Sequence, residues 1–164
     1  MKTTLTFLLL FFTLTVFSQK YTSPIDYNDA IVDLQIKIYD KLDTLENQMF
    51  KDDVNEKSCN KARKEVIKTT KKAIKTLNKI SDFDGDDKFQ KSGMELFKSI
   101  LDVLNNEYAV LIKLYSKPLE EFTSEDDVTI NETWIELDEK IIKTEDVFLS
   151  EQEKFAENHG FILY

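Results

Sequence analysis

The chain contains few of the residues that make turns and cross-links. Its 164 residues include only three glycines, two prolines and one cysteine. An all-β fold needs many tight turns, and glycine and proline supply most of these, so the shortage argues against such a fold. Cys59 has no second cysteine to pair with, and packing alone must hold the chain together. We expect its thiol either to be buried in the core or to pair with a second chain.

The sequence also lacks the residues that most catalytic and metal sites require. His159 is the only histidine, and it precedes Gly160, where a charged imidazole would favour the C-terminal end of a helix. A zinc, haem or hydrolase site would need a second histidine or an activated thiol. A di-iron centre would need Glu-x-x-His pairs, and the residue three before His159 is Ala156. We therefore predict a protein that is not an enzyme and holds no cofactor.

One long hydrophobic run is present, and it lies at the start of the chain. Lys2 precedes an apolar stretch from Leu5 to Phe17, followed by Ser18 and Gln19. This is the pattern of a signal peptide, and the run is shorter than the ~20 residues of a membrane-spanning helix. No cysteine follows that could carry a lipid anchor. We predict that residues 1–19 are removed and that residues 20–164 form one secreted or periplasmic domain.

Hydrophobic residues in the remainder recur at spacings of three and four, the period of an amphipathic helix. The pattern predicts four helices at about 24–51, 54–81, 87–117 and 125–159. The third has the widest apolar stripe, so it should be buried on more than one side. Because the connections are short, consecutive helices must be antiparallel. We predict an all-α protein with an antiparallel up-down-up-down four-helix bundle.

Charge is distributed unevenly over these helices. The net charge is −9, but the span 57–79 holds nine basic residues and only Glu65 as an acid, whereas 120–157 holds 14 acids and three bases. Seven lysines of the second helix are candidates for binding an anionic envelope component or an acidic protein: Lys61, Lys64, Lys68, Lys71, Lys72, Lys75 and Lys79. A solvated face without a partner is the alternative. The acidic balance and the absence of interleaved aromatic residues argue against nucleic acid.

Two acidic clusters are weak candidates for cation binding. The first surrounds Gly85 in the loop before the third helix: Asp82, Asp84, Asp86 and Asp87. Its spacing differs from that of an EF-hand, and capping of the third helix by Asp84 or Asp86 explains the same residues. The second cluster should form at one end of the bundle, where the first and third connections meet: Asp52, Asp53, Glu120, Glu121, Glu125, Asp126 and Asp127. Helix caps and the favourable placement of acids at helix starts explain several of these residues, and cation binding is the second choice.

Two polar residues interrupt the apolar stripe of the last helix. Glu145 and Gln152 lie between hydrophobic residues that are expected to face the core. They either lie at the rim of the bundle or form a hydrogen-bonded network with Gln35 or Asn28 of the first helix. The sequence leaves both arrangements open.

Several short motifs resemble those of a family of bacterial surface proteins of uncharacterised function, first named from leptospires. They are Tyr27-Asn28-Asp29 with Ile31-Val32 and Gln35, Phe83-Asp84-Gly85-Asp86, Glu107-Tyr108, and Gln152 with Phe155-Ala156. The resemblance implies an exported helical envelope protein and supplies no catalytic residues. Many such proteins look like lipoproteins, and this chain differs by lacking the anchor cysteine.

The leading hypothesis from sequence is a non-enzymatic helical bundle of the bacterial cell envelope with a binding or structural role. The alternative is a periplasmic carrier that binds a small ligand or a divalent cation between its helices or at its acidic end.

Overall fold

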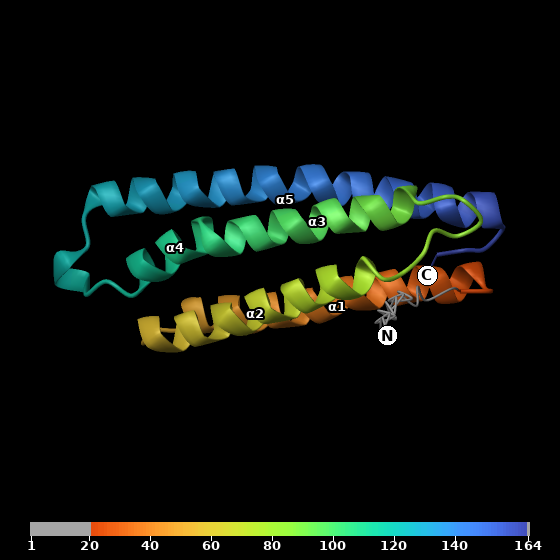
Figure 1. Cartoon of the computed structure of the whole chain (residues 1–164). Coiled ribbons are helices and arrows are strands. Elements are labelled where there is room, and N and C mark those ends of the chain that lie inside the picture. The colour runs from red at the N-terminus through yellow and green to blue at the C-terminus, as the bar shows by residue number, and fades with distance from the viewer. Residues whose placement is uncertain (1–20, 164) are drawn as a thin grey trace, which may run out of the picture.

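The computed structural model describes residues 21–163, so the predicted signal peptide lies outside the described residues. It contains α1 (Pro24–Met49), α2 (Glu56–Leu77), α3 (Lys88–Asn105), α4 (Glu107–Tyr115) and α5 (Ser124–His159), with a 3₁₀ turn, η1, at Leu119–Glu121. Helices α3 and α4 follow one another along a single rod. The described chain is therefore an antiparallel four-rod bundle, as the sequence predicted (Figure 1).

Local sequence sets the ends of these helices. The Ser23 hydroxyl accepts a hydrogen bond from the Asp26 amide at 3.3 Å, and Pro24 is the first helical residue, so α1 begins as predicted. Gly160 ends α5 with a left-handed φ of 70°. The starts of two other helices differ slightly from those predicted. Asn55 caps α2, which begins at Glu56 instead of 54, and Thr123 forms a capping box with Asp126, so that α5 begins at Ser124 instead of 125.

The third predicted helix is not continuous, which corrects the expectation for residues 87–117. It breaks at Asn106, whose φ of −108° and ψ of −80° are not helical. Arg63 of α2 donates a hydrogen bond to the Leu104 carbonyl at 2.8 Å, and Lys140 of α5 pairs with the buried Glu107 at 2.5 Å. The Arg63 side chain thus satisfies one carbonyl at the break, and the Glu107–Lys140 ion pair holds the start of α4 against α5. The rod ends at Tyr115, before Pro118.

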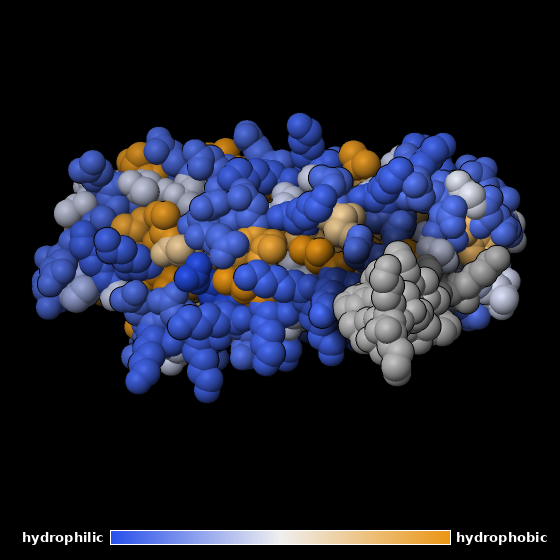
Figure 2. Space-filling view, in the orientation of Figure 1, coloured by the Kyte–Doolittle hydropathy of each residue, from blue (hydrophilic) through white to orange (hydrophobic). Residues whose placement is uncertain are grey.

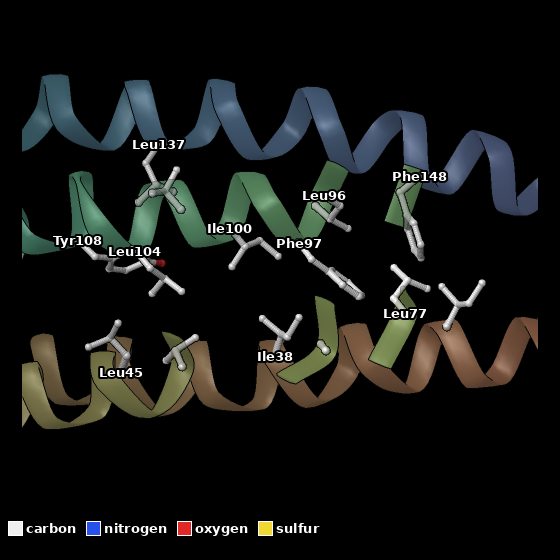
Figure 3. Packing of buried hydrophobic residues seen from close by; sticks show 14 of the residues in the cluster. Ile38, Leu45, Leu77, Leu96, Phe97, Ile100, Leu104, Tyr108, Leu137 and Phe148 are labelled. Atoms are coloured by element: carbon white, nitrogen blue, oxygen red, sulfur yellow. The ribbon is translucent and has the colours of Figure 1, made fainter. Parts of the chain in front are cut away.

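The core lies along the axis between the four rods. Figure 3 shows Ile38 of α1, Ile100 of α3 and Phe148 of α5 pointing into the space between the helices. All three side chains are fully buried. Near one end, the Phe89 ring lies 5.1 Å from the Phe148 ring, centroid to centroid. Cys59 is also fully buried, in agreement with the first of the two alternatives given for its thiol.

The rods do not pack equally closely. Helix α1 packs mainly on α2, and α5 mainly on α3, whereas α1 and α5 make few close backbone contacts. Polar side chains connect this looser pair. The Gln152 amide donates a hydrogen bond to Asn28 Oδ1 at 2.9 Å, and the Tyr39 hydroxyl donates one to Glu145 at 2.7 Å. Of the arrangements that the sequence left open, the bond between Gln152 and Asn28 forms as expected, whereas Glu145 accepts from Tyr39 instead of bonding to Gln35 or Asn28.

Candidate functional site

A groove runs along the outer side of the α1–α2 pair. It consists of two adjoining cavities of about 570 and 370 Å³ that share Lys41 and Glu65. Its floor is made of short or apolar side chains from both helices: Leu34, Thr44, Ser58, Ala62, Thr69, Ala73 and Thr76. Its sides carry five lysines: Lys37, Lys41, Lys61, Lys68 and Lys72. Small residues on α2 leave this hollow because they fill little of the space between the two helices.

Helical periodicity places the lysines along the groove. On α2, Lys61, Lys68 and Lys72 are separated by seven and four residues, which keeps them on one face. On α1, Lys37 and Lys41 are one turn apart. The two helices are antiparallel and joined by a short connection, so both sets of lysines border the same hollow.

The groove carries excess positive charge. Asp40 and Glu65 are its only acidic lining residues among the described part of the chain. Lys68 Nζ lies 3.7 Å from a carboxylate oxygen of Glu65, but both side chains are exposed, and exposed ion pairs contribute little to stability. Within residues 21–163, Lys41, Lys61 and Lys72 form no ion pair. These ammonium groups are available to an anionic partner.

The seven lysines that the sequence suggested as binding residues do not all lie at the groove. All seven are exposed, but only Lys61, Lys68 and Lys72 line the groove. Lys64, Lys71 and Lys75 lie on α2 away from it, and Lys79 follows the end of the helix. Sequence reasoning missed Lys37 and Lys41. Their spacing of four beside the apolar stripe of α1 was the available signal.

The lower part of the face in Figure 2, where α2 runs, is mostly hydrophilic.

The acidic loop before α3 folds as a tight turn. The Phe83 and Asp86 backbones exchange hydrogen bonds of 3.1 and 2.9 Å, and Asp84 and Gly85 both have positive φ. Asp86 Oδ1 accepts from the Lys88 amide at 3.0 Å, and Asp87 pairs with Lys91 at 2.6 Å. Asp86 thus bonds to the first residue of α3, but the N-cap position is occupied by Asp87, not by Asp84 or Asp86, and the Asp87 side chain makes no capping hydrogen bond. In residues 21–163 no three acidic, histidine or cysteine side chains are grouped so as to hold a metal ion.

A separate cavity of about 290 Å³, outside the groove, lies between α1 and α5. Four carboxylates border it and no basic residue does, among the described residues: Asp43, Glu46, Asp138 and Glu145. Tyr39 and Tyr108 donate to Glu145 and Glu46 at 2.7 and 2.5 Å. Burial raises the pKa of both phenols, and the hydrogen bonds to carboxylates raise it further.

The predicted acidic end of the bundle also forms. The α1–α2 connection and the segment between α4 and α5 lie at the same end of the molecule (left in Figure 1). Asp126 there is engaged by Lys117 at 2.7 Å and by the Thr123 amide and hydroxyl. These contacts lower the pKa of Asp126 to about 2. The Asp126 carboxylate thus caps α5 and pairs with Lys117.

The two chemically reactive side chains lie in apolar surroundings. The His159 ring lies 4.5 Å from Phe155 and 5.0 Å from Phe83, centroid to centroid. The fully buried Cys59 lies on α2, and burial raises the pKa of its thiol, which opposes formation of the nucleophilic thiolate.

Comparisons with protein families, curated proteins and solved structures find no match to this chain. Among the helices of residues 21–163, none has the combined length and hydropathy required to cross a bilayer.

Proposed function

We propose that this chain is an exported, non-enzymatic bundle protein of the bacterial cell envelope that binds an acidic partner in the α1–α2 groove. The observation that carries the proposal is the groove itself, where five lysines from two helices border an apolar and small-residue floor. Export rests on the predicted signal peptide at residues 1–19, and the envelope location also on the resemblance to surface proteins.

The shape of the groove favours one kind of acidic partner. A purely ionic ligand such as a polysaccharide would use the lysines and leave the floor of Leu34, Ala62 and Ala73 uncovered. An amphipathic helix with acidic flanks would bury an apolar ridge on this floor and place carboxylates beside the lysines. The groove therefore fits an acidic helix better than a polyanion alone.

Fluorescence anisotropy with two labelled probes tests this proposal. One probe is a designed acidic peptide with leucine at every seventh position, and the other is polyglutamate of equal length. We expect the peptide to bind more tightly, and its affinity to fall as salt rises. Equal or weaker peptide binding relative to polyglutamate would contradict a role for the floor.

A matched pair of variants locates the binding. Lys41→Glu with Lys72→Glu reverses two groove charges and should weaken peptide binding at least about tenfold. The reason is that charges along a binding groove set the association rate of the peptide and its alignment in the groove. Lys64→Glu with Lys71→Glu makes the same change in net charge on α2 outside the groove, and should have an effect of less than about threefold. Equal losses in both pairs would mean that diffuse charge, not the groove, drives binding.

The α1–α5 cavity supports a second candidate function, a carrier of a small ligand. The specific observation is its lining of four carboxylates and two tyrosines around apolar side chains, with no grouping suited to a metal ion among the described residues. This composition favours a small organic cation over calcium. Calorimetric titration with spermidine and with calcium tests it: heat from spermidine that disappears in Glu46→Gln with Glu145→Gln supports the carrier, and the absence of such heat contradicts it.

A further inference from the structure

Helix α5 exposes a regular line of large apolar side chains. Val128, Ile135, Ile142 and Leu149 are 54, 59, 54 and 44% exposed, and each follows the last by seven residues. Seven residues make about two helical turns, so these side chains form one ridge along the helix, about 32 Å long over 21 residues. Within the described structure no other helix covers this ridge. A heptad ridge of this kind is the surface that a helix presents to another helix.

Acidic and polar residues border the ridge on both sides. One border lies four residues beyond each ridge position: Glu132, Glu139, Asp146 and Glu153. The other lies three residues beyond: Asn131, Asp138, Glu145 and Gln152, of which Glu145 and Gln152 are half-buried and already hydrogen-bonded to Tyr39 and Asn28 of α1. Neither border contains a basic residue. Two such ridges would repel one another, so the surface that covers the ridge must itself be basic.

The α1–α2 groove of the same protein has the complementary properties. It offers a small-residue floor to an apolar ridge and lysines to acidic borders. On α2 its lining runs from Ser58 to Thr76, about 27 Å of helix, close to the length of the ridge. Asp40 and Glu65 are the two lining residues of the opposite sign.

The fold keeps the two surfaces apart. Helix α5 packs on α3 and α4, and α2 packs on α1 and α3, so α2 and α5 occupy opposite corners of the bundle. One molecule can therefore offer its groove and its ridge to two neighbours at the same time.

We propose that the acidic partner of the groove is α5 of a second copy of this chain, an inference that rests on the proposed function. The contact joins two different surfaces, so it repeats from one molecule to the next. Such a heterologous contact builds a ring if the rotation closes and a filament if it does not.

Sedimentation velocity of the purified protein, over a range of concentration and salt, tests this assembly. We expect larger species as concentration rises at low salt, and their dissociation at high salt because opposite charges drive the contact. A wild-type protein that remains monomeric up to about 1 mM, the range of weak contacts, overturns the inference.

Charge reversal on the two surfaces identifies the contact. Glu139→Lys with Asp146→Lys reverses the ridge border, and Lys41→Glu with Lys72→Glu reverses the groove. Each double variant alone should lose association, because like charges then face one another. An equimolar mixture should regain it, because each reversed surface finds an opposite one. Glu120→Lys with Glu121→Lys, in the exposed η1 turn, carries the same change in net charge as the ridge variant and should associate like the wild type.

The outcomes separate this inference from the proposed function. If the mixture fails to associate although both variants keep their helical circular dichroism spectra, the head-to-tail contact is overturned. If the wild type stays monomeric while the designed acidic peptide still binds the groove, the proposed function stands and the second copy is not the partner. If the peptide also fails to bind, both are refuted.

Discussion

Replacing Gly93 with alanine tests how closely the four rods pack. Gly93 lies within α3, and a Cβ atom added there would be 3.2 Å from Phe148 Cε2 on α5. It would also be 3.4 Å from Ile31 Cγ2 on α1 and 3.4 Å from Leu77 Cδ2 on α2. These three neighbours are fully buried, and each belongs to a different helix. A single methyl group at this position therefore presses on the other three rods at once.

Two effects of opposite sign decide the result. Alanine is more favourable than glycine inside a helix by about 1 kcal/mol. Overpacking a full core costs about 1–3 kcal/mol, and the contact with Phe148 is shorter than the 3.5–4.0 Å optimum for carbon atoms. The Phe148 ring cannot move away freely because it packs on Phe89. We expect Gly93→Ala to reduce the free energy of unfolding by about 0–2 kcal/mol, and Gly93→Val by more.

Urea unfolding, followed by circular dichroism, measures this change. The exposed Lys71 of α2 provides the control, because the difference between Lys71→Ala and Lys71→Gly reports helix propensity without packing, about 1 kcal/mol. If Gly93→Ala stabilises the protein by as much as that difference, the close approach of the helices at Gly93 is refuted. A smaller loss for Gly93→Ala in a Phe148→Leu background would show that the phenylalanine ring is the obstacle.

Three further predictions concern individual side chains. Arg63→Met should lower the free energy of unfolding by about 1–3 kcal/mol, because it leaves the Leu104 carbonyl at the α3–α4 break without its donor; urea unfolding with amide hydrogen exchange measures this, and an unchanged exchange rate around the break would contradict it. The pKa of Asp126, lowered chiefly by the hydrogen bond from Lys117, predicts a stabilising contribution that is present above ~pH 4 and is lost as the pH falls to about 2. The stability difference between wild type and Asp126→Asn should therefore shrink over that range, and a constant difference would refute the assignment. The Cys59 thiol should react with a disulfide reagent far more slowly in the native protein than in denaturant, and equal rates would show that it is not buried.

Sequence reasoning found the helices but misplaced interruptions that depend on other parts of the chain. Apolar periodicity continues past Asn105 and Asn106, and although asparagine is a poor helix former, this pair alone does not show that the helix breaks there. At the break, Arg63 of α2 satisfies the Leu104 carbonyl and Lys140 of α5 pairs with Glu107, so both contacts come from helices far away in sequence. The start of α2 lies two residues after the predicted one for a local reason, since Asp53 and Asn55 are both good caps and the structure uses Asn55.

Only part of the candidate groove could be predicted from the sequence. The excess of lysine on α2 is visible in the sequence, but a helix has several exposed faces, and composition does not say which one borders a neighbour. Lys61 and Lys64 differ little as sequence positions, yet only the first lines the groove. Lys37 and Lys41 were overlooked because their contribution depends on α1 lying beside α2.

The sequence by itself determined the helical class, the antiparallel order, the lack of an internal disulfide and the separation of basic and acidic residues. These follow from composition and from a period of 3.6 residues, both of which are local properties. Tertiary structure alone decided that small residues on α2 leave a hollow beside α1, that Asn28 meets Gln152, and that the heptad line of α5 stays exposed. These features depend on the rotation of each helix about its axis and on its distance from its neighbours, and packing of the whole core sets both.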